Sequence, residues 1–212
     1  MRITDLSLPL YHGMRGVAFE QNTTITINNY NTSNLLLYSH AGTHMDAPLH
    51  FVENGRTIAN VELNKTVGPA QVLDLTHKAP HSLITIADLE PFADLVQPQS
   101  RLLLRTDWDQ HADADDYRTH FPRISLELAQ WLVERDVWLL GVQTPSVASV
   151  RPEDRQELID VHQTLLSAEI VIVESLANLH LLEQSEVFFI ALPLKLDGID
   201  GSPVRPIALE NY

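Results

Sequence analysis

The sequence predicts a mixed α/β fold. Short apolar runs rich in Val, Ile and Leu indicate strands, and they alternate with stretches in which apolar residues recur at helical spacing. The 212 residues are enough for one sizeable core, so we expect a single domain over residues 1–212. A hydrophobic content of 44% and a charged content of 20% are typical of a globular protein.

Strands are expected where β-branched and aliphatic residues gather between turn residues. The alternation of Thr and Ile over residues 24–27 favours one strand, and the apolar run 35–38 favours another. The other expected strands cover residues 2–6, 70–75, 101–105, 137–142, 170–173, 187–192 and 203–209.

Three helices are expected, over residues 85–95, 126–135 and 152–166. Thr85 and Asp88 supply a capping oxygen and a first-turn acid for the first helix, and Ser125 is placed to cap the second. Pro152 suits the first turn of the third. Residues 54–65 and 108–123 are expected to be loops, the second long and polar enough for a lid or an oligomer contact.

The composition excludes several classes of function. No cysteine is present, so disulfides, thiolate zinc sites and cysteine nucleophiles are absent. A net charge of −14 argues against nucleic acid as a partner, though not against a small anionic substrate. No apolar run is long enough to cross a bilayer and residues 1–6 lack the apolar core of a signal peptide, so we expect no membrane partner and a cytoplasmic location.

The most informative stretch holds three histidines and an aspartate: His40, His44, Asp46 and His50. A single histidine is commonly a surface or capping residue, but the pattern His-x3-His-x-Asp-x3-His directly after an apolar run favours a metal site. His40, His44 and Asp46 would leave a tetrahedral ion one position for water, whose pKa falls from about 15.7 to about 7 on such an ion. His50 is then suited to move protons, because a free imidazole titrates near neutral pH.

A second cluster lies far along the chain, at His162 and Glu174. Glu174 ends an apolar run that indicates a buried strand, and a carboxylate there is seldom left unpaired. Taken alone, Glu174 is explained as well by an arginine partner or a helix cap, and His162 by an exposed position. The two residues acquire a joint meaning only beside the first cluster.

These two clusters together resemble the cyclase family, which contains bacterial kynurenine formamidase and isatin hydrolase. The segment His40-Ala-Gly-Thr-His44-Met-Asp46-Ala-Pro-Leu-His50 carries most of the resemblance. Weaker pieces follow in family order, at residues 5–10, 104–106, 121–122, 141–147, 174–179, 192–194 and 200–205. The resemblance implies a swivelling β/β/α fold and a homodimer or homotetramer in which a neighbouring chain helps to close the active site.

The resemblance also implies a cofactor of one or two divalent ions per subunit, usually Zn²⁺ or Mn²⁺. The first ion would be held by His40, His44 and Asp46. Asp46 would bridge to a second ion held by His162 and Glu174, and the general acid/base would be His50.

The chain departs from kynurenine formamidases in the loop 11–19, which has no Trp where those enzymes carry a substrate-contacting one. Gln143 and Ala148 stand where the family usually has acids. Residues expected to contact the substrate are His12, Arg15, Phe19 and Trp108. Because the aromatic wall is altered, we expect N-formylkynurenine not to be the best substrate.

The function predicted from these features is hydrolysis of an amide or cyclic amide C–N bond in a small molecule by metal-activated water. Ester or lactone hydrolysis and dehydration are the nearest alternatives in chemistry. A non-catalytic metal- or ligand-binding relative is the alternative of another class. The presence of His50 favours an enzyme, because a purely structural metal site does not need a proton shuttle.

Overall fold

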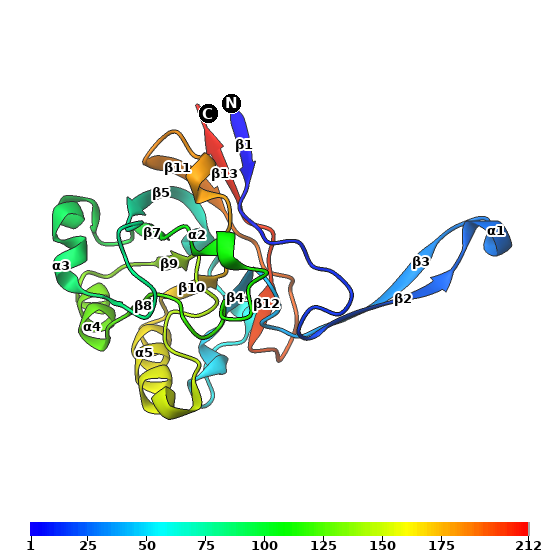
Figure 1. Ribbon diagram of the computed structural model, residues 1–212, viewed down its shortest axis with the longest axis horizontal. Coiled ribbons are helices and arrows are strands. Elements are labelled where there is room, and N and C mark those ends of the chain that lie inside the picture. Colours follow the sequence, from blue (N-terminus) through cyan, green and yellow to red (C-terminus); the bar gives the residue numbers. More distant parts are fainter. Residues whose placement is uncertain (212) are drawn as a thin grey trace.

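Nine strands form one curled, mixed sheet in the computed structural model, which describes residues 1–211 (Figure 1). Their order across the sheet is β1-β13-β11-β5-β7-β9-β10-β4-β12. The central neighbours β5, β7, β9 and β10 run parallel, and every other pairing in this sheet is antiparallel. The strand bounds are β1 (Arg2–Asp5), β4 (His44–Asp46), β5 (Val67–Asp74), β7 (Arg101–Arg105), β9 (Leu139–Val142), β10 (Val171–Glu174), β11 (Glu186–Ile190), β12 (Gly201–Pro203) and β13 (Ile207–Glu210).

Three helices, α3 (Ile86–Leu89), α4 (Leu126–Glu134) and α5 (Arg155–Ser167), gather on one side of the sheet (Figure 1). The expected caps are present: the Ser125 side chain accepts a hydrogen bond from the Leu128 amide, and Thr85 and Asp88 form a reciprocal capping box. A 3-10 turn over Glu90–Leu95 continues α3, and another over Pro152–Asp154 precedes α5. Among residues 1–211, no helix is both long enough and apolar enough to span a lipid bilayer.

The core lies on both faces of the sheet, because alternate residues of a strand point in opposite directions. On β7, Leu102 and Leu104 pack toward the helices, whereas Leu103 packs on the other face with Phe189 of β11. All four side chains are completely buried. Burying a leucine or phenylalanine contributes about 1.5–3 kcal/mol, so the continuous apolar runs of the central strands hold the sheet together.

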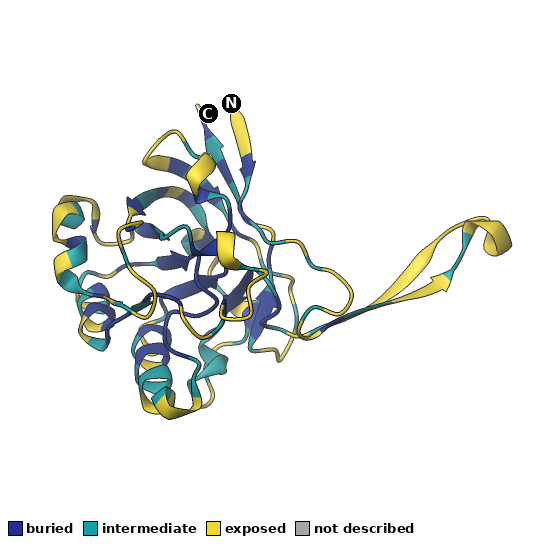
Figure 2. Ribbon diagram, in the orientation of Figure 1, coloured by how far each residue is buried: buried dark blue, intermediate teal, exposed yellow. Residues whose placement is uncertain are grey.

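A two-stranded hairpin, β2 (Val17–Thr23) and β3 (Thr32–Leu37), projects from this body (Figure 1). It is exposed along most of its length (Figure 2). The expected strand over residues 24–27 is wrong: helix α1 (Ile25–Asn28) forms the tip of the hairpin. The alternation of Thr and Ile predicts a strand with one buried face, but no residue of α1 is buried, so a tight helical turn forms instead.

Three other expectations need correction. The strand expected over 203–209 is two strands, β12 and β13, which lie at separate places in the sheet and are divided by a segment containing Pro206. The loop expected over 54–65 contains a 3-10 turn (Ile58–Asn60) and the start of α2 (Leu63–Thr66). The segment 108–123 begins with a 3-10 turn (Trp108–His111) and ends in the short strand β8 (Arg123–Ile124), which pairs with β6 (Leu83–Ile84).

Candidate metal centre

Strand β4 brings two of the predicted ligands to the same side of the sheet. Its three residues are His44, Met45 and Asp46, so the period of two turns His44 and Asp46 one way and buries Met45 in the core. Gly42 just before the strand has a positive φ of 57°, which suits glycine. Its carbonyl oxygen lies 2.8 Å from Nδ1 of His44. Because a carbonyl only accepts, Nδ1 carries a proton, and Nε2 is the ring nitrogen directed at the cluster.

The pairing of β4 with β10 places Glu174 directly opposite His44. Oε2 of Glu174 is 3.2 Å from Nε2 of His44, and Oε1 accepts a hydrogen bond from the amide of Val147. Burial alone would raise the pKa of Glu174, but the hydrogen bonds with His162 and His44 outweigh burial and hold its pKa well below its usual range. Glu174 is therefore an ionised carboxylate inside the protein.

His162 reaches the same place from helix α5. Its Nδ1 lies 2.7 Å from the carbonyl oxygen of Leu158, one helical turn earlier, so this ring also turns Nε2 toward the cluster. Nε2 is 3.5 Å from Oε1 of Glu174 and 4.0 Å from Oδ2 of Asp46. Burial lowers the pKa of His162, but the hydrogen bond and charge of Glu174 outweigh burial and raise it. In the absence of a metal, therefore, Glu174 favours a proton on His162.

The buried carboxylate of Asp46 is incompletely satisfied. Its side chain is 1% exposed, and Oδ2 has no hydrogen-bond partner among residues 1–211. An unpaired carboxylate oxygen inside a protein is costly unless a cation or donor meets it. With Oδ2 facing Nε2 of His162, and Nε2 of His44 3.5 Å from Oδ1, the arrangement fits a cation.

The distances within the cluster fit the spacing of donor atoms around a divalent ion. Metal–ligand bonds of about 2.1 Å at tetrahedral angles separate neighbouring donor atoms by roughly 3.4 Å. The separations among His44, Asp46, Glu174 and His162 run from 3.2 to 4.0 Å. Imidazole nitrogen and carboxylate oxygen suit zinc and manganese. The residues present therefore fit a divalent transition metal.

His40 lies on the opposite side of Asp46, with Nδ1 2.8 Å from Asp46 Oδ1 and Nε2 2.8 Å from Asp200 Oδ2. Burial lowers the pKa of His40, but the hydrogen bonds and charges of Asp46 and Asp200 outweigh burial and raise it to about 9. Strand β12 supports the ring closely. A Cβ at Gly201 would lie 2.7 Å from Cε1 of His40, so a larger residue there would displace the histidine.

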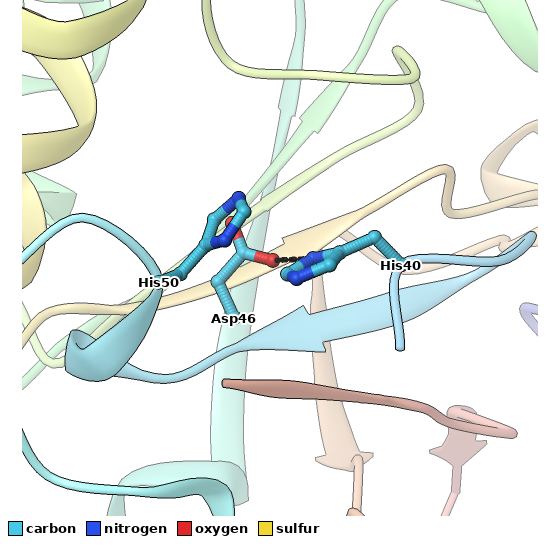
Figure 3. A group of neighbouring side chains, drawn as sticks. All are labelled: His40, Asp46 and His50. Atoms are coloured by element: carbon cyan, nitrogen blue, oxygen red, sulfur yellow. Dashed lines mark hydrogen bonds and ion pairs between the residues drawn. The ribbon is translucent and has the colours of Figure 1, made fainter. Parts of the chain in front are cut away.

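His50 ends a 3-10 turn (Pro48–His50) and stacks on His40, with 3.8 Å between the ring centroids. Figure 3 shows both rings turned toward the Asp46 carboxylate. Nδ1 of His50 is 3.2 Å from Oδ2 of Asp200, and 24% of the side chain is exposed, against 4% for His44. Burial lowers the pKa of His50, and the nearby His40 and His162 lower it further. His50 is therefore the histidine of the cluster most accessible to a small molecule.

Two groups of potential ligands share Asp46: His40, Asp46 and His50 form one, and His44, Asp46 and Glu174 form the other. A third group, Asp107, Asp109 and His180, lies elsewhere. Its carboxylates already have partners: Asp107 pairs with Arg105, while Asp109 accepts hydrogen bonds from Gln143 and from the amide of Asn178.

The cluster opens into a cleft of about 360 Å³, and a second cavity of about 430 Å³ lies beside it. Of the four residues predicted to contact substrate, Arg15 lines both spaces. His12 is exposed and its ring interacts with the backbone of Phe19 at the base of the hairpin. Trp108 is 5% exposed and its indole donates to the carbonyl oxygen of Tyr117, so it supports the wall of the second cavity from behind.

Sequence reasoning missed two residues at this site, Asp200 and Arg118. Asp200 contacts both His40 and His50, and Arg118 lines both the cleft and the second cavity. Asp200 precedes the glycine that lies against His40, but no spacing rule connects it with residues 40–50. Arg118 lies in a polar loop with no motif of its own.

Known proteins resemble this chain along most of its length. A family model described as "Putative cyclase" matches residues 4–149. Kynurenine formamidase of Bacillus thuringiensis subsp. konkukian (strain 97-27) is 35% identical over 177 residues, which cover 84% of this chain and 79% of the relative.

Solved structures share the fold. Isatin hydrolase A from Labrenzia aggregata, bound to benzyl benzoate, superimposes with a TM-score of 0.84 at 25% identity, covering 100% of this chain and 94% of that one. A structure described as a predicted metal-dependent hydrolase from Bacillus stearothermophilus gives a TM-score of 0.79 at 28% identity, covering 98% and 97%. The mixed α/β fold class is thereby confirmed. With its family motif on β4 and relatives that match along most of its length, the chain belongs to the cyclase family.

Proposed function

We propose that this protein hydrolyses an amide or cyclic amide C–N bond of a small molecule, using a divalent metal and His50 as general acid/base. The observation that carries the proposal is the buried Oδ2 of Asp46, which lacks a partner among the described residues 1–211 and faces Nε2 of His162. Relatives named kynurenine formamidase and isatin hydrolase support a C–N bond outside a peptide as the target.

The metal is Zn²⁺ or Mn²⁺, with one or two ions per subunit. His40, His44 and Asp46 would hold one ion, and His162 and Glu174, together with Asp46, would hold a second. Asp46 belongs to both groups of potential ligands, which supports a shared role for it, although His44 groups with Glu174 there and His40 with His50. A bound divalent ion lowers the pKa of water toward about 7 and polarises a carbonyl oxygen.

His50 provides the proton transfers. It takes a proton from the attacking water and delivers one to the leaving nitrogen, so that the C–N bond breaks to an amine and a carboxylate product. Its lowered pKa favours the neutral form that accepts a proton near pH 7. Asp200 sets the orientation of the ring by its contact with Nδ1, which turns Nε2 away from Asp200.

We also propose that the protein works as a homodimer or homotetramer. An isolated two-stranded hairpin is only marginally stable in water, yet β2 and β3 project from the body with apolar residues exposed. Leu35 is 62% exposed and Leu36 is 70% exposed. A second copy that packs on the hairpin would bury these side chains.

The test is a hydrolysis screen of the metal-loaded protein with small N-formyl compounds, cyclic amides and lactones. We expect turnover of an amide or cyclic amide that a chelator abolishes and Zn²⁺ or Mn²⁺ restores. We expect N-formylkynurenine to have a lower kcat/KM than the best compound, because the loop 11–19 lacks the Trp that contacts the substrate in kynurenine formamidases. Turnover confined to lactones, or turnover that survives metal removal, would overturn the proposal.

A further inference from the structure

Two arginines in the wall of the cleft have no acidic partner in the described part of the chain. Arg15 and Arg118 line both the metal cleft and the second cavity, so they lie where the two spaces meet. Across residues 1–211, neither forms an ion pair or a side-chain hydrogen bond with a carboxylate. The guanidinium of Arg15 lies 5.0 Å from the ring centre of Tyr38, which also lines the cleft.

This lack of partners is unexpected from the composition. The chain has 28 acidic residues for 14 lysines and arginines, so acidic partners are plentiful. Asp113 and Asp115 line the same second cavity, yet neither pairs with the two arginines. Partial burial and the positive charge of Arg15 lower the pKa of Arg118, although the charge of Glu174, which lines the same cleft, acts in the opposite direction. Two neighbouring cations, one of them half-buried, therefore leave a site that favours an anion.

We infer that Arg118, assisted by Arg15, binds a carboxylate of the substrate and so selects amides that carry an anionic group. This rests on the proposed amide hydrolysis and names the class of its substrate. Guanidinium groups bind carboxylates through paired N–H donors, and they do so most strongly where water is partly excluded. Arg118 is the stronger of the two, because it is half-buried whereas Arg15 is exposed.

The placement of the arginines orients such a substrate. His40 also lines both spaces, so the arginines share the boundary with a residue of the metal cluster. A carboxylate held at the boundary allows the amide to enter the metal cleft. The rest of the substrate can lie in the second cavity, where Leu8, Pro9 and Met14 provide an apolar wall.

The experiment compares N-formylkynurenine, which carries a carboxylate, with its methyl ester, which lacks that negative charge, and measures formate release by the metal-loaded protein. The variants are Arg118→Gln, Arg118→Lys and the control Arg155→Gln, which removes a positive charge from an exposed position at the start of α5. Arg118→Gln should lower kcat/KM for the acid by about 10- to 100-fold and leave the ester unchanged. Arg118→Lys should restore part of the loss, and Arg155→Gln should behave as wild type. An equal loss for acid and ester in Arg118→Gln would overturn the inference.

A binding measurement separates this inference from the proposed function. Anthranilate and neutral 2-aminobenzamide are titrated into the same proteins, with their own fluorescence as the signal. Any contact between anthranilate and the metal is common to wild type and variant, so the difference between them reports Arg118. Anthranilate binding that weakens at least 10-fold in Arg118→Gln, with no turnover of any amide or cyclic amide in the hydrolysis screen, would sustain the arginine site and defeat amide hydrolysis. Absent or unchanged anthranilate binding would overturn the arginine site whatever the turnover.

Discussion

The histidines of the cluster differ in what holds their Nδ1 atoms. In His44 and His162 a backbone carbonyl oxygen accepts from Nδ1, so Nε2 is left to meet a cation. In His40 and His50 Nδ1 faces a carboxylate instead. Either kind of partner can orient the ring of a metal-bound histidine. His50 differs from the other three in exposure, 24% of its side chain against 7% or less, and this favours a proton-transfer role for it.

Replacing His50 by Ala should reduce turnover by about 10²–10⁴-fold, the usual contribution of a general acid/base, while most of the metal remains bound. The reason is that His50 is the most exposed histidine of the cluster, while the buried His44, Asp46 and Glu174 stay in place. Steady-state kinetics and metal analysis on the same preparation check this. Loss of metal in proportion to activity would instead make His50 a ligand.

His40 should make the stability of the metal-free protein depend on pH. Its pKa is raised to about 9 from the ordinary 6.5, so its contribution is present in full below pH 6.5 and disappears as the pH rises through 9. The difference in unfolding free energy between wild type and His40→Gln should therefore shrink over this range, by no more than about 3 kcal/mol. Urea unfolding of chelator-treated protein at a series of pH values measures it. A difference that grows with pH would show that His40 is neutral in the metal-free protein.

At the scale of elements, the site depends on the register between two strands. The pairing of β4 with β10 sets Glu174 opposite His44, although the two residues are far apart in the sequence. A shift of one residue would turn His44 and Asp46 into the core and Met45 into the cleft. The complete burial of Met45 opposes that shift, so hydrophobic packing on one face of β4 fixes the ligands on the other.

The exposed hairpin gives the prediction that belongs to this scale. Leu36→Glu should shift the protein toward monomers, because a charge replaces an apolar side chain that we propose a second copy covers. The lost burial is worth about 1.5–3 kcal/mol, enough to weaken association by roughly 10- to 100-fold. Sedimentation velocity over a range of concentrations measures the shift.

Leu63→Glu is the matched control, since Leu63 is 57% exposed but lies in α2, outside the hairpin. It should leave the oligomeric state unchanged. A monomeric wild-type protein, or an equal response of the two variants, would remove the hairpin as the contact between copies.

At the scale of the whole molecule, local patterns of apolar residues in the sequence correctly predicted those strands and helices that pack into the core. The strand expected over 101–105 coincides with β7, because its apolar run Leu102–Leu104 suits a central strand covered on both faces. Sequence pattern failed to predict the structure of residues 24–27, because this segment lies at the exposed tip of the hairpin and packs against no hydrophobic core. The positions of Arg118 and Asp200 in the site could not be predicted, because each depends on how distant segments pack.

The central claim is that the buried cluster holds a divalent metal, and metal content tests it most directly. Wild type, His44→Ala, His162→Ala and His180→Ala are purified without chelator and their bound metals measured by mass spectrometry. We expect Zn²⁺ or Mn²⁺ in wild type and in His180→Ala, whose altered residue belongs to the separate group with Asp107 and Asp109, and a large loss in the other two. Equal metal content in His44→Ala and wild type, or a loss confined to His180→Ala, would contradict the site described for this protein.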